Sequence, residues 1–166
     1  MSLVRRTGPV LDLACGSGRH TRLLLDRGHH VVALDRDVRG LADLTDLVGQ
    51  GRLQMVEHDI EKDDDLPFPP ASFAGVVVTN YLYRPVLDAL VGVVAPGGVL
   101  IYETFARGNE RFGRPSRPEF LLGPGELLDL VRGRLRVVAY EDVVTDGPRP
   151  AAVQHIAAVR EPTLAR

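Results

Sequence analysis

The sequence predicts an α/β fold with a doubly wound, seven-stranded sheet that is mostly parallel and has an antiparallel last strand. Three observations support this prediction. Short apolar runs alternate along the chain with amphipathic stretches, which is typical of strand–helix units in a parallel sheet. A turn with two glycines follows the first apolar run. The last two apolar runs are joined by a link that is too short for a crossover helix.

Length and composition predict a single domain over residues 1–166. Hydrophobic residues make up 45% and charged residues 25% of the chain, as in ordinary globular proteins. Neither a signal peptide nor a run of about 18 apolar residues is present, so we expect no membrane span. The single cysteine, Cys15, excludes an internal disulfide and a cysteine-rich zinc site. It suits a reducing cytoplasm, and we expect a cytoplasmic protein with no metal site.

The first strand is expected over residues 10–13, and Gly16 and Gly18 then turn the chain into a helix. This helix is expected to begin at Arg19 and to stop at Gly28. Glycine has no Cβ, and a helix N-terminus presents unpaired N–H groups and partial positive charge. The turn is therefore a place where the backbone can approach a ligand closely.

The second apolar run, residues 30–35, ends in Asp35. Asp35 follows Gly18 by 17 residues, about one helix and one strand. In a right-handed βαβ unit its carboxylate then lies beside the glycine turn, where it can accept hydrogen bonds from both hydroxyls of a ribose. The ligand is therefore expected to carry a nucleoside.

The next stretch continues the alternation of helix and strand. A helix capped by Asp37 is expected to run to Gly49 and Gly51. A third strand over residues 52–57 follows, and residues 62–70 are expected to form an acidic, proline-rich loop without regular structure.

A fourth strand over residues 73–80 is rich in β-branched residues at its centre. Pro85 suits the first turn of a helix. The expected apolar face of this helix consists of Leu87, Leu90, Val91 and Val94. The turn Pro96-Gly97-Gly98 then leads into a fifth strand over residues 99–105.

The last third of the chain predicts one helix and two strands. Residues 106–123 show no clear period, and Pro124 is expected to open a helix that Gly133 closes. The final strands, residues 135–143 and 152–160, are expected to run in opposite directions.

The glycine turn resembles motif I of the class I S-adenosylmethionine-dependent methyltransferases, in which an acidic residue precedes a G-x-G pair. Asp12 with Gly16 and Gly18 fits this motif, and Asp35 fits the acidic residue that ends the second strand. The proline-glycine-glycine turn before the fifth strand also resembles this family. The arginine-bearing segment of residues 107–117 and the short N-terminus resemble the small bacterial, tellurite-resistance-like methyltransferases.

The resemblance implies a Rossmann-like class I methyltransferase fold over residues 9–160, S-adenosyl-L-methionine as the cofactor and methyl transfer as the activity. Only residues 1–8 precede the first strand, where similar enzymes carry helices. An N-terminal cap is therefore expected to be nearly absent, either in a minimal enzyme or in a trimmed chain.

The resemblance also implies roles for individual residues. The turn backbone would line the amino-acid tail of the cofactor, and Asp12 would either brace the turn or reach the ammonium through water. Arg19 and His20 lie within reach of the tail carboxylate, with surface solvation as the alternative for His20. The expected cofactor-binding residues are Asp12, Ala14, Gly16, Ser17, Gly18, Arg19, His20, Asp35, Arg36, Asp59, Ile60, Asn80 and Tyr81.

Asp35 is expected to bind the ribose, and Asp59 the adenine amino group unless it is an ordinary loop aspartate. On the acceptor side, Glu103 and Tyr102 are candidate bases at the end of the fifth strand, although no catalytic residue can be named. The arginines of residues 107–117 favour an anionic small substrate or, alternatively, form a solvated loop. The expected acceptor-side residues are Tyr83, Glu103, Arg107 and Arg111.

Three other function classes stay open. An NAD-dependent oxidoreductase is disfavoured because Thr21 stands where a G-x-G-x-x-G turn needs its third glycine. A nucleic-acid methyltransferase is disfavoured by the net charge of −2 and by Tyr81 and Leu82 in place of two prolines. A non-catalytic nucleoside-binding or scaffold protein is harder to exclude. We expect a small-molecule substrate and no membrane or nucleic-acid partner, with a homodimer as one option.

Overall fold

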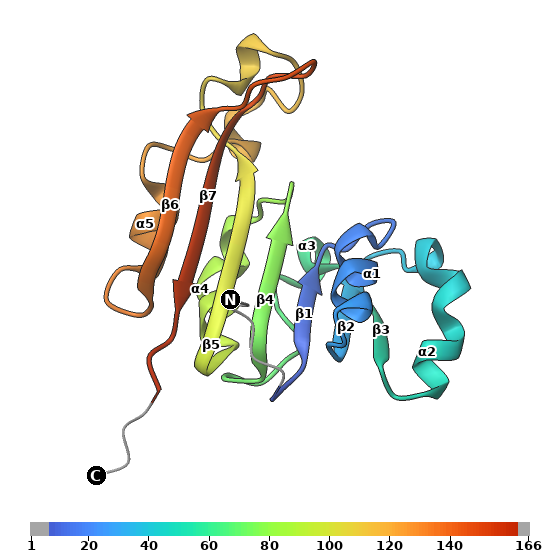
Figure 1. Cartoon of the computed structure of the whole chain (residues 1–166). Helices are drawn as coiled ribbons and strands as arrows, with labels where there is room; N and C mark the ends of the chain where they lie inside the picture. The colour runs from blue at the N-terminus through green and yellow to red at the C-terminus, as the bar shows by residue number, and fades with distance from the viewer. Residues whose placement is uncertain (1–6, 163–166) are drawn as a thin grey trace.

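The structure is a computed structural model that describes residues 7–162, so the expected short N-terminal segment lies largely outside the described residues. Seven strands form one sheet in the order β3-β2-β1-β4-β5-β7-β6 (Figure 1). The strands are β1 (Val10–Leu13), β2 (Val31–Asp35), β3 (Leu53–Glu57), β4 (Phe73–Thr79), β5 (Val94–Phe105), β6 (Arg136–Val144) and β7 (Ala152–Val159). The pairs from β3 to β5 are parallel, whereas β7 pairs antiparallel with both β5 and β6. The predicted fold class is confirmed.

Helices cover both faces of this sheet, and Figure 1 shows α1 and α2 in front of it. The α-helices are α1 (Arg19–Asp26), α2 (Thr45–Gly49), α3 (Ile60–Asp63), α4 (Leu87–Gly92) and α5 (Glu126–Val131). Four short 3₁₀ helices accompany them, namely η1 (Arg39–Leu44), η2 (Arg84–Val86), η3 (Asn109–Arg111) and η4 (Pro118–Phe120). Within residues 7–162, no helix has the length and apolarity needed to cross a bilayer.

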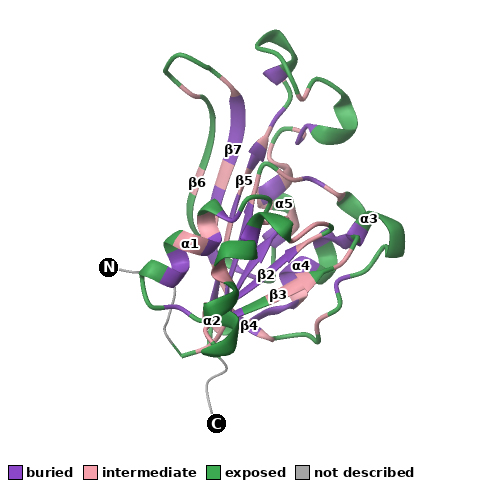
Figure 2. Cartoon of the chain, turned by 90° about the vertical axis from the view of Figure 1, so that its right-hand side faces the viewer, coloured by how far each residue is buried: buried purple, intermediate pink, exposed green. Residues whose placement is uncertain are grey.

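Two hydrophobic clusters occupy the two faces of the sheet. Leu11 of β1 packs in the cluster beneath α4 and α5, while its neighbour Val10 packs in the cluster beneath α1. Neither side chain is exposed to solvent. Alternate side chains of a strand point to opposite faces, so a strand with both faces covered is apolar throughout. Figure 2 shows these buried strands in purple beneath largely exposed helices and loops.

Some elements differ from the prediction because short helices leave little periodic signal. Asp37 is not a helix N-cap; its carboxylate accepts the Arg39 N–H at 3.0 Å, and η1 precedes α2. Residues 62 and 63, expected in an irregular loop, belong to α3. Asp59 caps this four-residue helix by accepting the Glu61 N–H at 3.2 Å.

The start of β5 also differs from the prediction. Val94 was expected on a helix face, but it pairs with Phe73 and begins β5. The proline-glycine-glycine turn thus lies within β5, where the register with β4 shifts. The predicted start of the last helix at Pro124 is likewise wrong, because Gly125 is the N-cap of α5.

Candidate functional site

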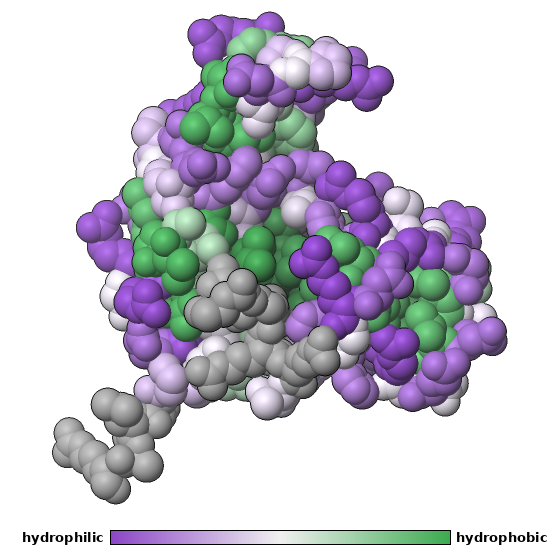
Figure 3. Space-filling model, viewed as in Figure 1, coloured by the Kyte–Doolittle hydropathy of each residue, from purple (hydrophilic) through white to green (hydrophobic). Residues whose placement is uncertain are grey.

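The candidate site lies at the carboxyl ends of the parallel strands, where the strand order reverses between β1 and β4. In open α/β sheets this switch point is the usual place for a ligand. The segment after β5 and the turn between β6 and β7 project at the top of the molecule (Figure 1). Figure 3 shows the surface hollowed between this projection and the body below it. A first cavity of about 330 Å³ is lined by Ala14, Leu34, Asp35, Arg36, His58, Asp59, Ile60, Glu61 and Tyr81.

Gly16 and Gly18 in the turn differ in what surrounds them. Gly18 has a φ of +81°, which L side chains rarely adopt, and a Cβ there would come within 2.1 Å of Leu41 Cδ2, so the buried Leu41 side chain would have to shift. Gly16 has a φ of +54°, which L side chains rarely adopt, yet a Cβ there would meet nothing within 4 Å. The backbone at Gly16 is therefore open to a ligand.

Asp35 connects the glycine turn to the turn that follows β2. Its Oδ2 accepts the Gly16 N–H at 2.8 Å, and its Oδ1 accepts the Asp37 N–H at 3.1 Å. The structure thus brings Asp35 beside the glycine turn and into the wall of the first cavity. Each carboxylate oxygen keeps a second lone pair, which can accept a ligand hydroxyl.

Asp12 lies beneath the turn rather than in the cavity wall. Its side chain is 2% exposed and accepts the Thr21 hydroxyl at 2.6 Å. Burial raises the pKa of Asp12, and the hydrogen bond from Thr21 partly opposes this effect. Asp12 therefore braces the start of α1. In the sequence, Thr21 stands out only as the residue in the third-glycine position. Its place nine residues after the acidic strand residue Asp12 is the signal that could have indicated this hydrogen bond.

The wall opposite the turn comes from the end of β3 and from α3. Asp59 and the buried Ile60 line it together with His58, which sequence reasoning missed. His58 Nε2 lies 2.9 Å from Asp65 Oδ1, and its Nδ1 lies 3.8 Å from Asp63 Oδ2. Among the described residues, these three side chains are the group that could share a metal ion. Each ring nitrogen faces its own carboxylate, however, and this geometry fits ion pairs better than a shared metal.

A second cavity adjoins the first. It measures about 240 Å³ and is lined by Glu61, Asn80, Tyr81, Leu82, Thr104, Phe105, Pro115 and Phe120. Tyr81 and Glu61 belong to both cavities. The hydroxyl of Tyr102, buried behind this wall, donates to the Tyr81 carbonyl oxygen at 2.7 Å and fixes its backbone. Asn80, expected against the cofactor, lines the second cavity.

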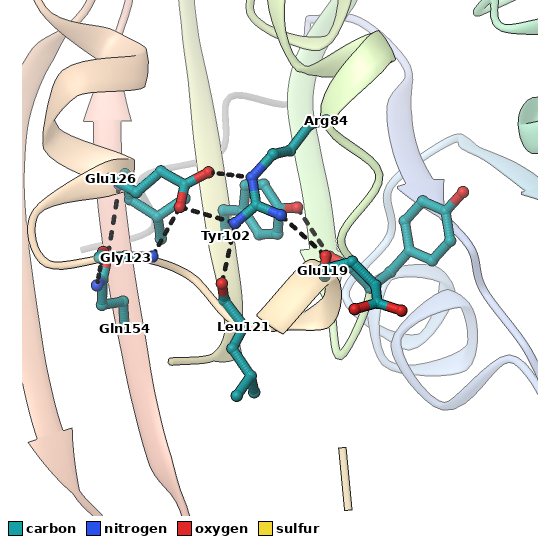
Figure 4. A network of polar contacts seen from close by, with 9 residues as sticks. Arg84, Tyr102, Glu119, Leu121, Gly123, Glu126 and Gln154 are labelled. Atoms are coloured by element: carbon teal, nitrogen blue, oxygen red, sulfur yellow. Dashed lines mark hydrogen bonds and ion pairs between the residues drawn. The ribbon is translucent and has the colours of Figure 1, made fainter. Parts of the chain in front are cut away.

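The segment that carries Pro115 and Phe120 forms the roof of the second cavity. A polar network holds this roof in place (Figure 4). The Arg84 guanidinium donates to Glu126 at 2.7 and 3.0 Å and to the carbonyl oxygens of Glu119 and Leu121, both at 2.9 Å. Glu126 in turn accepts the Gly123 N–H at 2.7 Å. Burial alone would raise the pKa of Glu126, but Arg84 and the Gly123 N–H outweigh it and lower that pKa. No motif in the sequence marked this network.

Several predicted residues lie outside both cavities. Arg111 stacks over Phe112 at 5.5 Å, and Glu103 Oε2 lies 3.6 Å from His155 Nε2. Tyr83 donates to Asp64, and His20 Nδ1 lies 3.2 Å from Thr79 Oγ1. The other predicted residues outside the two linings are Asp12, Gly16, Ser17, Gly18, Arg19 and Arg107.

The thiol of Cys15 is poorly suited to act as a nucleophile. Burial raises its pKa to about 12, so it remains protonated at neutral pH. Its side chain packs against the cluster beneath α1. The structure thus gives Cys15 the surroundings of a packing residue.

Comparison with known proteins points in one direction. A family model described as a methyltransferase domain matches residues 10–98. The demethylmenaquinone methyltransferase of Clavibacter sepedonicus is 35% identical over 104 residues, which cover 58% of this chain and 41% of that protein. The chain thus spans about two fifths of the length of this curated relative.

Solved structures share the fold over most of the chain. A methyltransferase of Methanosarcina mazei, described as SAM-dependent, has a TM-score of 0.72 at 15% identity and covers 97% of this chain and 96% of its own. The 1,6-didemethyltoxoflavin-N1-methyltransferase of Burkholderia thailandensis, solved with S-adenosylhomocysteine, also has a TM-score of 0.72, at 20% identity. That match covers 94% of this chain and 72% of the other. At these identities the likeness shows the class I fold alone.

Proposed function

The chain belongs to the methyltransferase-domain family, and from this premise we propose that it is an S-adenosylmethionine-dependent methyltransferase acting on a small-molecule acceptor. The observation that carries the proposal is the first cavity at the switch point. There the Asp35 carboxylate stands between the glycine turn and the apolar and polar wall of β3 and α3. This arrangement suits a ligand with a ribose and a flat, apolar base.

The residues of the first cavity fit this cofactor. Asp35 would hold the ribose hydroxyls, while Asp59 and the backbone at Ile60 would hold the adenine. When bound, S-adenosylmethionine supplies a methyl group already activated by its sulfonium. The protein then contributes mainly position: Asp35 orients one end of the cavity, and the fixed Tyr81 separates the two cavities.

Three observations favour a small acceptor. The second cavity, at about 240 Å³, has room for a small molecule rather than for a polymer. The net charge of −2 disfavours nucleic acid. The relatives named above carry small-molecule acceptors in their names.

The single cysteine supports a cytoplasmic location. The homodimer and the tellurite-resistance-like subgroup stay predictions.

Calorimetric titration with S-adenosylhomocysteine tests the proposal. We expect Asp35→Ala to weaken binding at least about tenfold, since two charge-assisted hydrogen bonds to the ribose are lost. Asp37→Ala is the matched control, because Asp37 is a neighbouring aspartate outside the first cavity and pairs with the exposed Arg39. Its affinity should match that of the native chain.

The outcomes are distinct. Binding that Asp35→Ala leaves unchanged would keep the family and contradict our placement of the ribose. A folded native chain that does not bind S-adenosylhomocysteine would contradict the proposed function. Binding without methyl transfer to any acceptor would favour the nucleoside-binding or scaffold alternative.

A further inference from the structure

We propose that the second cavity binds the methyl acceptor and selects an uncharged, ring-shaped molecule with a hydroxyl or amino group, rather than an anion. The inference rests on the proposed function and names the substrate class of its site. It is carried by the lining of the second cavity, by the fixed position of the roof and by the location of the nearby arginines.

The walls of the second cavity are mostly apolar and aromatic. Leu82 is buried, and Tyr81, Phe105 and Phe120 contribute three rings. Flat apolar molecules pack well against such rings. Asn80 and Thr104 add uncharged polar groups that can orient a hydroxyl or an amine on the acceptor.

The charge in this lining is negative. Glu61 is its one charged residue, and it lines the first cavity as well. An anionic acceptor would lose water against apolar walls and would meet the like charge of Glu61, and none of the lining side chains is a cation that could pair with it. The second cavity therefore disfavours carboxylates and phosphates.

The arginines that favoured an anionic substrate lie elsewhere. Among the described residues, Arg107, Arg111, Arg114 and Arg117 line neither cavity. Arg111 stacks over Phe112, and Arg117 lies 3.8 Å from Glu119. Arg84, which anchors the roof, directs its guanidinium to Glu126 and to two carbonyl oxygens. None of these contacts places a positive charge in the second cavity.

Phe120 gives the proposal its clearest test. Its ring is 45% exposed although it is apolar, and η4 holds it at the second cavity. Phe112 offers a matched comparison, because it is 41% exposed and lies on the same segment but outside the lining. If a ligand bound to exposed apolar surface in general, removing either ring would weaken its binding. If it binds in the second cavity, only the removal of the Phe120 ring should weaken its binding.

The experiment uses the full chain saturated with S-adenosylhomocysteine and two probes that share the naphthalene ring, the uncharged 2-naphthol and the anionic 2-naphthoate. Their dissociation constants are measured by saturation-transfer NMR titration. We expect 2-naphthol to bind at least about tenfold more tightly, because the carboxylate would be desolvated beside Glu61. Phe120→Ala should weaken 2-naphthol binding at least about fivefold, Phe112→Ala should not, and Glu61→Gln should reduce the discrimination against 2-naphthoate.

Each contrary result overturns the inference. These results are equal or tighter binding of 2-naphthoate, equal losses in Phe112→Ala and Phe120→Ala, or binding of neither probe to the loaded chain. In all three the affinity for S-adenosylhomocysteine stays intact, so the proposed function survives. Loss of S-adenosylhomocysteine binding in the native chain would instead overturn the proposed function and this inference with it.

Discussion

Asp12 and Thr21 form a pair whose importance depends on burial rather than on the family motif. Both side chains are almost completely buried, and the Thr21 hydroxyl donates to the Asp12 carboxylate in addition to the backbone of Thr21. A buried acceptor that loses its donor carries the full cost of desolvation. The start of α1, and with it the glycine turn, therefore depends on a threonine in the third-glycine position.

We expect Thr21→Val to lower the free energy of unfolding by about 1–3 kcal/mol, because the isosteric change removes the hydroxyl that donates to the buried Asp12 carboxylate. Urea unfolding followed by circular dichroism measures this change. Thr45→Val is the control, since the Thr45 hydroxyl is exposed and donates to the Ala42 carbonyl oxygen at 3.3 Å. Equal stability losses in the two variants would show that Asp12 does not depend on Thr21.

At the scale of elements, the Arg84 network joins parts of the chain that do not adjoin in sequence. Arg84 belongs to η2, Glu126 begins α5, and the carbonyl oxygens of Glu119 and Leu121 lie in and just after η4. Gln154 of β7 extends the network by donating to the Gly123 carbonyl oxygen at 2.7 Å. The roof of the second cavity is therefore attached to η2 through Arg84 and, through Gly123 and Gln154, to β7 of the sheet.

The lowered pKa of Glu126 predicts a pH effect on stability. A carboxylate whose folded pKa lies below its ordinary value of 4.5 stabilises the fold above that value. This contribution is lost as the pH falls through the lower folded pKa. We therefore expect the native chain to lose stability on acidification below 4.5 more steeply than Glu126→Gln does.

Urea unfolding at a series of pH values measures this difference. Glu119→Gln is the control, because the Glu119 side chain is exposed on the neighbouring turn, and its profile should follow that of the native chain. Superimposable profiles for Glu126→Gln and the native chain would contradict the stabilising role of the ion pair.

At the scale of the whole molecule, burial falls from the centre of the sheet to its edges. All four residues of β1 are buried, whereas eight of the nine residues of β6 are exposed. Local opening requires less free energy where fewer apolar contacts are broken. The sheet should therefore open from the β6 edge while the central strands β1 and β4 stay closed.

Hydrogen exchange measured by mass spectrometry tests this gradient. We expect the amides of β1 and β4 to exchange most slowly and those of β6 faster. Addition of S-adenosylhomocysteine should slow exchange at residues 58–61 and leave β6 unchanged, since those residues line the first cavity. Protection of β6 as strong as that of β1 would contradict the gradient and would indicate that a second subunit covers this edge.

The sequence by itself determined the features that depend on local patterns. Apolar runs and glycine turns indicated the strands and their order along the chain, because alternation and turn chemistry are encoded within a few residues. The handedness of βαβ units then placed Asp35 beside the glycine turn, where the structure has it. The short link between residues 145 and 150 was enough to predict the antiparallel end of the sheet.

Only the tertiary structure decided the features that join distant residues. Arg84 and Glu126 are 42 positions apart, and the second cavity draws on α3, the residues that follow β4, the end of β5 and the roof segment. Helix α3 is too short to be stable alone and forms where Asp59 caps it and Ile60 is buried. The arginines of residues 107–117 were grouped in sequence, but folding directed them away from both cavities. Contacts between distant segments depend on the packing of the whole sheet, which no local pattern records.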